Sequence, residues 1–126
     1  MSAVFDSSAV LAVIFRENGA AAARDAAEDA IMSAVNVTEV ITRMIDEGAN
    51  REEALRSLRK VGPAIRPFDE ALALEAGFLR TSTRQYGLSL GDRACLALAL
   101  RERAPVVTAD RTWAKLDLGI DIRVIR

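Results

Sequence analysis

The sequence predicts an α/β fold with a central, mainly parallel sheet of five strands, in one domain that spans residues 1–126. Short apolar runs alternate with longer amphipathic ones, which is typical of βαβ units. The chain has 126 residues, 51% of them hydrophobic, which is enough for one core and leaves little room for a second. No internal repeat or linker interrupts the alternation.

Five short apolar runs are the candidate strands. The segments between them are long enough for the crossover connections that parallel strands require. The runs are Ala3–Phe5, Ala30–Ala34, Ala64–Phe68, Val106–Thr108 and Ile122–Ile125.

Apolar residues at helical spacing predict helices between these strands. The clearest series, from Val37 to Ile45, keeps the 3.6-residue period and ends at Gly48. Proline follows two of the other segments, as expected near a helix end. Besides a helix that begins near Ser8, we expect helices over Val37–Gly48, Asn50–Lys60, Glu70–Tyr86 and Asp92–Arg103.

The sequence contains no histidine, which limits the chemistry that it can perform. Ser-His-Asp triads, nucleases with a histidine base and zinc sites on histidine pairs are excluded, so catalysis must rest on carboxylates. The net charge of −1 provides no strong basic field for nucleic acid. Fifteen of the 17 basic residues are arginine, which binds phosphate or carboxylate groups in a bidentate manner. Codon preference explains this bias equally well.

The first segment of the chain predicts neither a secretion signal nor a membrane anchor. It lacks a basic region, and Asp6, Ser7 and Ser8 interrupt its apolar run. No stretch of the sequence reaches the length of a membrane span. We therefore expect a cytoplasmic protein. Its only cysteine, Cys95, is expected to be a small buried apolar residue rather than a reactive thiol.

Four acidic residues fall where a parallel sheet would gather them. Asp6 directly follows the first strand, and Asp110 lies just beyond the fourth. Glu39 lies in the first turn of the helix after the second strand. Ligands of open parallel sheets bind at the carboxyl ends of the strands, so these three acids are predicted at one edge. Asp92 begins the helix that leads into the fourth strand, and it joins them if that helix starts nearby.

Each acid taken alone is explained more simply as a helix cap. Aspartate is a preferred N-cap residue, and Asp6, Asp92 and Asp110 each precede an expected helix or turn. Asn36 and Glu39 have the spacing of a capping box. Glu39 lies on the polar side of its helix, where it faces either water or a polar cleft. The four acids in combination favour a site.

Four carboxylates that converge at one edge suggest a metal ion. Their mutual repulsion raises their pKa values or requires a cation to keep them ionised. Oxygen ligands without histidine or cysteine favour Mg²⁺ or Mn²⁺ over zinc, and Mg²⁺ keeps water for a phosphate and a nucleophile. A remaining carboxylate can orient or deprotonate the attacking water. The pattern is therefore suited to phosphoryl transfer.

Four segments in this order resemble the PIN-domain ribonucleases, and closely the VapC-type toxins of type II toxin-antitoxin systems: VFDSSAVLAVIF, SAVNVTEV, LSLGDRACLALAL and VVTADRTW. The resemblance covers essentially the whole chain. It implies a PIN-like three-layer α/β/α fold. It matches Asp6, Glu39, Asp92 and Asp110 to the family's catalytic quartet, with Asp6 and Asp92 as the metal ligands.

The resemblance also implies an activity and partners. Members of the family cleave RNA endonucleolytically with Mg²⁺, for which Mn²⁺ can substitute, usually as homodimers. A cognate antitoxin restrains them by placing its C-terminal segment in the active-site groove. For this chain the implied substrate is RNA, with tRNA as one candidate. DNA is reached only through the antitoxin, and no membrane partner is expected.

Four further residues are matched to supporting positions of the family. Ser8 and Thr108 correspond to polar residues that support the acids, or they form local bonds from hydroxyl to backbone. Asn36 resembles a residue that borders the site, although capping explains it better. Arg93 contacts phosphate or antitoxin, or it is a solvated residue at a helix start.

Two residues near the fourth acid limit what the resemblance implies. Trp113 is expected to pack in the core, because one aromatic residue does not make a base-stacking surface. Some relatives carry a second Asp or Asn two residues after the fourth acid. Thr112 occupies that position here, which leaves a second metal ion in doubt.

Three other functions suit the same alternating pattern. A phospho-accepting receiver domain needs an acidic pair after the first strand and a lysine after the last, and both are missing, although Asp69 follows the third strand as a possible acceptor. A phosphatase with a nucleophilic aspartate is disfavoured because Ser8 stands where its second acid would be. A catalytically silent, PIN-like protein-binding module is the third alternative.

Overall fold

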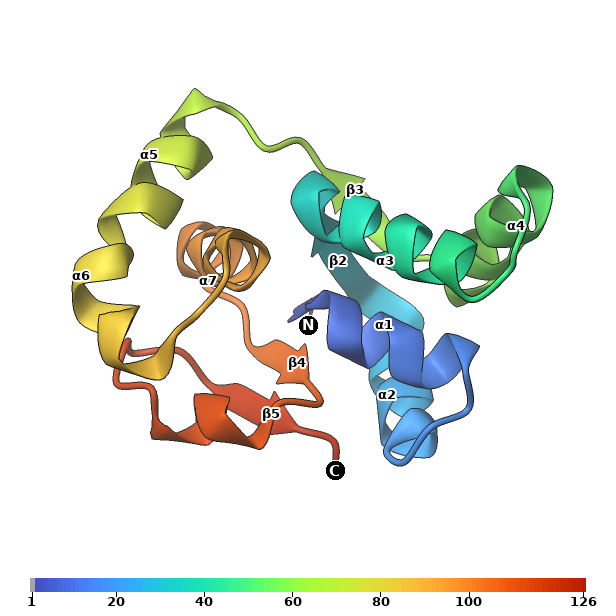
Figure 1. Cartoon of the computed structure of the whole chain (residues 1–126). Coiled ribbons are helices and arrows are strands. Elements are labelled where there is room, and N and C mark those ends of the chain that lie inside the picture. The colour runs from blue at the N-terminus through green and yellow to red at the C-terminus, as the bar shows by residue number, and fades with distance from the viewer. Residues whose placement is uncertain (1) are drawn as a thin grey trace.

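The computed structural model describes residues 2–126 and confirms the α/β fold with a parallel five-stranded sheet (Figure 1). All four neighbouring pairs are parallel, in the order β3-β2-β1-β4-β5. Three strands end one or two residues earlier than predicted. The strands are β1 (Ala3–Phe5), β2 (Ala30–Ser33), β3 (Ala64–Arg66), β4 (Val106–Thr108) and β5 (Ile122–Val124).

Helices connect the strands and cover the sheet. The α-helices are α1 (Ser7–Ile14), α2 (Ala20–Ala26), α3 (Ala34–Asp46), α4 (Arg51–Val61), α5 (Glu70–Phe78), α6 (Arg80–Thr83) and α7 (Leu90–Glu102). Short 3₁₀ segments are η1 (Ala27–Asp29), η2 (Arg84–Tyr86) and η3 (Arg111–Lys115). The sequence pattern gave no indication of α2. Within residues 2–126, no helix is both long and apolar enough to cross a membrane.

Alternating side chains of the central strands divide the core into two clusters, one on each face of the sheet. Val4 and Ile31 belong to the cluster with α5 and α7. Phe5 and Met32 belong to the cluster with α1, α3 and α4. This alternation is the two-residue period of a strand buried on both faces. The resulting three layers are those that the resemblance implied (Figure 1).

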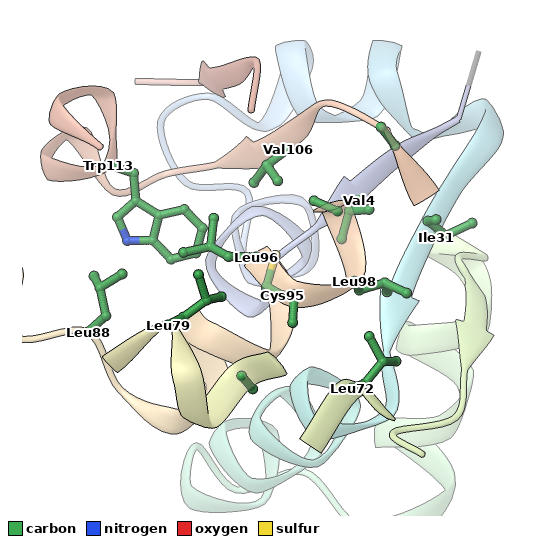
Figure 2. Packing of buried hydrophobic residues seen from close by; sticks show 14 residues of the cluster. Val4, Ile31, Leu72, Leu79, Leu88, Cys95, Leu96, Leu98, Val106 and Trp113 are labelled. Atoms are coloured by element: carbon green, nitrogen blue, oxygen red, sulfur yellow. The ribbon is translucent and has the colours of Figure 1, made fainter. Parts of the chain in front are cut away.

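Helix α7 lies at the centre of the first cluster (Figure 2). Every residue from Ala94 to Ala99 is buried, so this helix is apolar around its whole circumference there. Cys95 is buried within it, and Trp113 packs against the same cluster, as expected for both. The buried body of α7 fixes its first turn, which carries Gly91 and Asp92, relative to the sheet.

The single helix predicted over Glu70–Tyr86 is wrong. The segment is divided into α5, α6 and η2. The hydroxyl groups of Ser82 and Thr83 both donate to the carbonyl oxygen of Leu79, at 3.3 and 2.7 Å. Such bonds from side chain to backbone bend helices. The break therefore follows from the Thr-Ser-Thr run, which apolar periodicity does not register.

Candidate active site at the carboxyl edge of the sheet

Asp6 is the most deeply buried of the four acids, with 4% of its surface exposed. Its Oδ1 accepts from the backbone N–H of Ala9 at 2.9 Å, so the predicted cap of α1 is present. Burial raises the pKa of Asp6 from its ordinary 3.8 to about 6, against hydrogen bonds that lower it, and the nearby charge of Asp92 raises it further. The residue that caps α1 is therefore also an ionisable group, at the end of β1, whose charged form is disfavoured by burial.

Ser8 and Thr108 support Asp6 from two different elements. The Ser8 hydroxyl donates to Asp6 Oδ1 at 2.7 Å, and the Thr108 hydroxyl donates to Oδ2 at 2.6 Å. Each hydroxyl also accepts a backbone N–H, from Ala109 and Asp110 respectively. Both hydroxyl groups thus contact the acid, and the local bond to backbone that the sequence offered as an alternative is present for Thr108, whereas the backbone bond of Ser8 spans 101 residues. The chain from β4 to Asp110 is thereby tied to Asp6.

Glu39 is half-buried among polar groups and does not face open water. It is the sixth residue of α3, so its predicted place in the first turn is wrong, because the helix already begins at Ala34. Its Oε1 accepts from the Ser7 hydroxyl and from the Asn36 side-chain amide, both at 2.7 Å. These bonds hold the carboxylate between α1 and α3.

Asn36 is not a cap, which corrects the capping-box interpretation. The N-cap of α3 is Ser33, whose hydroxyl accepts the N–H of Val35. Asn36 is buried, and its Nδ2 donates both to Glu39 and, at 3.0 Å, to the carbonyl of Gly91. The amide thereby joins α3 to the first turn of α7. Its Oδ1 is buried without a donor in the described part of the chain.

Two residues that lie against the Glu39 carboxylate, Ser7 and Gly91, were missed by sequence reasoning. Ser7 lies 32 residues from Glu39, and no local pattern connects them. A Cβ at Gly91 would overlap the carboxyl carbon and both oxygens of Glu39. The one available signal was the small residue directly before Asp92.

Asp92 occupies the third position of α7 rather than its cap. Ser89 is the N-cap: its hydroxyl accepts the Asp92 N–H at 3.1 Å, and Asp92 Oδ2 accepts the Ser89 N–H at 2.9 Å. This reciprocal capping box was visible as the spacing Ser-x-x-Asp. Burial raises the pKa of Asp92, and the charges of Glu39 and Asp110 raise it further.

Asp110 caps the short η3 segment, as expected. Its Oδ1 accepts from both the N–H and the hydroxyl of Thr112, at 2.9 and 2.7 Å. Thr112 therefore holds the fourth acid in place instead of adding a ligand of its own. Trp113 follows as a fully buried packing residue.

Arg93 is half-buried and bonded within the fold, so the solvated alternative is wrong, while its contact with phosphate or antitoxin stays a prediction. Its Nη1 donates to the carbonyl of Ala76 in α5 at 3.0 Å, and its Nε is buried without a partner in residues 2–126. A cation at the last turn of a helix also interacts favourably with the carbonyl groups there. The guanidinium therefore links α5 to α7.

The four acids leave carboxylate oxygens available for a cation. In the described chain, Glu39 Oε2, Asp92 Oδ1 and Asp110 Oδ2 accept no hydrogen bond, and Asp6 Oδ2 accepts one. No ion pair found in that part involves any of the four.

This donor set fits Mg²⁺ or Mn²⁺, which prefer oxygen ligands. Across residues 2–126, no three acidic or cysteine side chains converge tightly enough to enclose an ion by themselves. Mg²⁺ does not require such a cage, since it usually binds one or two carboxylates and keeps several waters. Among the four acids, the charge of Asp92 acts on Asp6, so these two carboxylates lie near each other.

Solved structures with the same fold include toxin-antitoxin complexes. VapBC2 from Rickettsia felis, bound to a promoter DNA fragment, is 16% identical over 100% of both chains, with a TM-score of 0.75. A toxin-antitoxin complex from Klebsiella pneumoniae is 21% identical over 94% of both chains, with a TM-score of 0.73. VapBC-5 from Mycobacterium tuberculosis is 23% identical over 99% of this chain and 98% of the other, with a TM-score of 0.66.

These identities are low, so the likeness establishes a shared fold. No curated protein sequence matches the chain. The family model described as PIN domain matches residues 3–118, which include all four acids and the strands β1 to β4. The chain therefore belongs to the PIN domain family.

Proposed function

We propose that this protein is a Mg²⁺-dependent endoribonuclease that acts in the cytoplasm as the toxin of a toxin-antitoxin pair. The observation that carries the proposal is that four acids from four segments lie near enough for their charges to act on one another, each with a carboxylate oxygen free or only partly occupied. None of the ion pairs found in the described chain neutralises them. Membership of the PIN family and the likeness to VapBC structures support the same function.

The acids divide into two roles in this proposal. Asp6 and Asp92 hold the metal ion, which, when bound, polarises a phosphate oxygen and lowers the pKa of water. Their raised pKa values fit this role, because a bound cation offsets the cost of keeping buried carboxylates charged. Glu39, through its free Oε2, orients the attacking water and accepts its proton. Asp110 adds the fourth negative charge of the site, just beyond the end of β4.

Cleavage of RNA by purified protein, freed of any antitoxin, tests the proposal directly. With Mg²⁺ we expect endonucleolytic products from total RNA, including tRNA, and none with EDTA. Asp92→Asn keeps the shape of the side chain but removes the charge, so it should lower the cleavage rate by about 100-fold or more. Mn²⁺ should support cleavage in place of Mg²⁺.

Asp121→Asn is the matched control for Asp92→Asn. Asp121 directly precedes β5, at the opposite end of the strands, and the only partner of its side chain among the described residues is Arg123 at 3.1 Å. This control should cleave at the wild-type rate. Undiminished cleavage by Asp92→Asn would remove Asp92 from the mechanism, and EDTA-resistant cleavage would remove the metal ion.

The proposed partners are a cognate antitoxin and a second copy of the chain. Solved structures with this fold include toxin-antitoxin complexes, some of them with DNA, which supports contact with DNA through an antitoxin. Co-expression with the product of a small adjacent gene should give a complex that co-purifies and does not cleave RNA. Light scattering of the free chain should give the mass of a homodimer. A chain that is tolerated alone on overexpression would contradict the toxin role.

The receiver alternative is not supported by the strand order. In the flavodoxin-like order of receivers the third strand lies beside the first, whereas β3 is an edge strand here. Asp69, the possible phospho-acceptor, caps α5 and pairs with Arg101 at 2.8 Å. It lies outside the group of four acids.

A further inference from the structure

Gly91 is a glycine for which the backbone gives no reason. It is the second residue of α7, in regular helix, and it is not among the glycines with positive φ. At such a position alanine is the better helix former. The reason for glycine must therefore lie in what surrounds it.

The space beside Gly91 is occupied by the Glu39 carboxylate. A Cβ at position 91 would overlap the carboxyl carbon and both oxygens of Glu39. Because this carboxylate is the end of a flexible side chain, a substitution would displace Glu39 and leave the backbone of α7 in place. The displacement would break the bonds from Ser7 and Asn36, both 2.7 Å, that hold Oε1.

The two helices cannot simply separate to make room. The Nδ2 of Asn36 donates to the Gly91 carbonyl as well as to Glu39, so the same amide holds both sides of the contact. Residues 94–99 of α7 are buried in the core. The position of Glu39 relative to Asp92, the next residue along, is thus fixed by the missing side chain at 91.

We infer that Gly91 is a positioning residue of the candidate site: its missing Cβ provides the space in which the Glu39 carboxylate lies beside Asp92. Residues 39 and 91 form a matched pair, in which a glutamate at 39 requires a glycine at 91. The catalytic consequence rests on the proposed nuclease function, whereas the steric pairing does not.

Thermal unfolding of the metal-free protein tests the pairing without any assay of activity. Gly91→Ala should lower the unfolding midpoint when Glu39 is present. In a Glu39→Ala background the same change should raise the midpoint, because the space is then empty and alanine favours the helix. Equal shifts of the midpoint in the two backgrounds would overturn the inference.

Gly77→Ala provides the matched control. Gly77 is also a helical glycine without positive φ, in α5, and a Cβ there would meet nothing within 4 Å. Its substitution should raise the midpoint equally with and without Glu39, and should leave RNA cleavage unchanged.

RNA cleavage then tests the positioning role. Gly91→Ala should lower kcat by about tenfold or more with little change in KM, since a displaced general base slows chemistry rather than binding. In a Glu39→Asp background, whose acid is one methylene shorter, Gly91→Ala should change kcat less than about twofold. A kcat loss of the same factor in both backgrounds would overturn the positioning role. A wild-type protein without ribonuclease activity would overturn the proposed function and this catalytic role, while the unfolding midpoints still decide the steric pairing.

Discussion

Asp6 and Asp69 have the same local role and opposite ionisation behaviour. Each is an N-cap, and each accepts a helix N–H at 2.9 Å, from Ala9 and from Leu72. Burial raises the pKa of Asp6 to about 6. The Leu72 N–H and then Arg101 lower the pKa of the exposed Asp69.

The difference teaches that a capping motif does not distinguish a structural acid from a candidate catalytic one. Asp69 lies on the surface, where an arginine pairs with it. Asp6 lies between β1 and β4 with Asp92 as its charged neighbour, and no ion pair found among residues 2–126 involves it. Burial and neighbouring charge, both of which come from tertiary structure, separate the two aspartates.

The largest effect expected from this comparison is a pH-dependent stabilisation by Asp6→Asn. The folded-state pKa of Asp6, about 6, lies above its ordinary value of 3.8, so the ionised carboxylate lowers the free energy of unfolding. The full loss is present above about pH 6, decreases as the pH falls, and is absent below 3.8. A shift of this size corresponds to about 3 kcal/mol. Without metal at pH 7.5, Asp6→Asn should raise the free energy of unfolding by up to about that amount. Denaturant unfolding from pH 7.5 to 4 should show the gain disappearing.

Asp69→Asn, the matched change at the other cap, should have the opposite sign. Because the folded-state pKa of Asp69 is lowered, its ionised form stabilises the fold at pH values above the ordinary pKa. This stabilisation is lost as the pH falls through the lowered pKa. Asparagine preserves the cap, so the loss at neutral pH should be small and should vanish on acidification. If the two variants had the same pH dependence, the contrast between the two caps would be wrong.

An effect smaller than that of Asp6→Asn is expected from Thr108→Val, which removes the hydroxyl that donates to Asp6 and accepts the Asp110 N–H. The protein should lose about 1–3 kcal/mol, because buried polar groups are left unpaired. The pKa of Asp6 should rise further, so the pH range over which stability falls, which begins near the ordinary pKa of 3.8, should extend to higher pH in denaturant titrations.

Thr83→Val is the control for this change. Thr83 is equally buried, and its hydroxyl donates to the Leu79 carbonyl, with no acid involved. It should lower stability without moving the pH dependence. A pH profile that Thr108→Val leaves unchanged would show that this hydroxyl does not act on Asp6.

The fold was largely predictable because its signals are local. Apolar runs located all five strands, and Gly48 and Asn50 marked the boundary between α3 and α4. The wrong predictions were also local in origin: side-chain hydrogen bonds to the backbone set where helices begin and end, and hydrophobic periodicity does not detect them. Ser33 instead of Asn36 caps α3, and Ser82 and Thr83 interrupt the helix predicted through Tyr86.

The sequence by itself determined that Asp6 and Asp110 follow parallel strands at one edge of the sheet, because strand direction fixes where strand ends lie, and it predicted Glu39 at the same edge. Only the tertiary structure decided what surrounds them. Ser7 meets Glu39 across 32 residues, and Asn36 meets Gly91 across 55. Such contacts depend on how helices pack, and burial, which sets the pKa of Asp6 and Asp92, has no signature in local spacing.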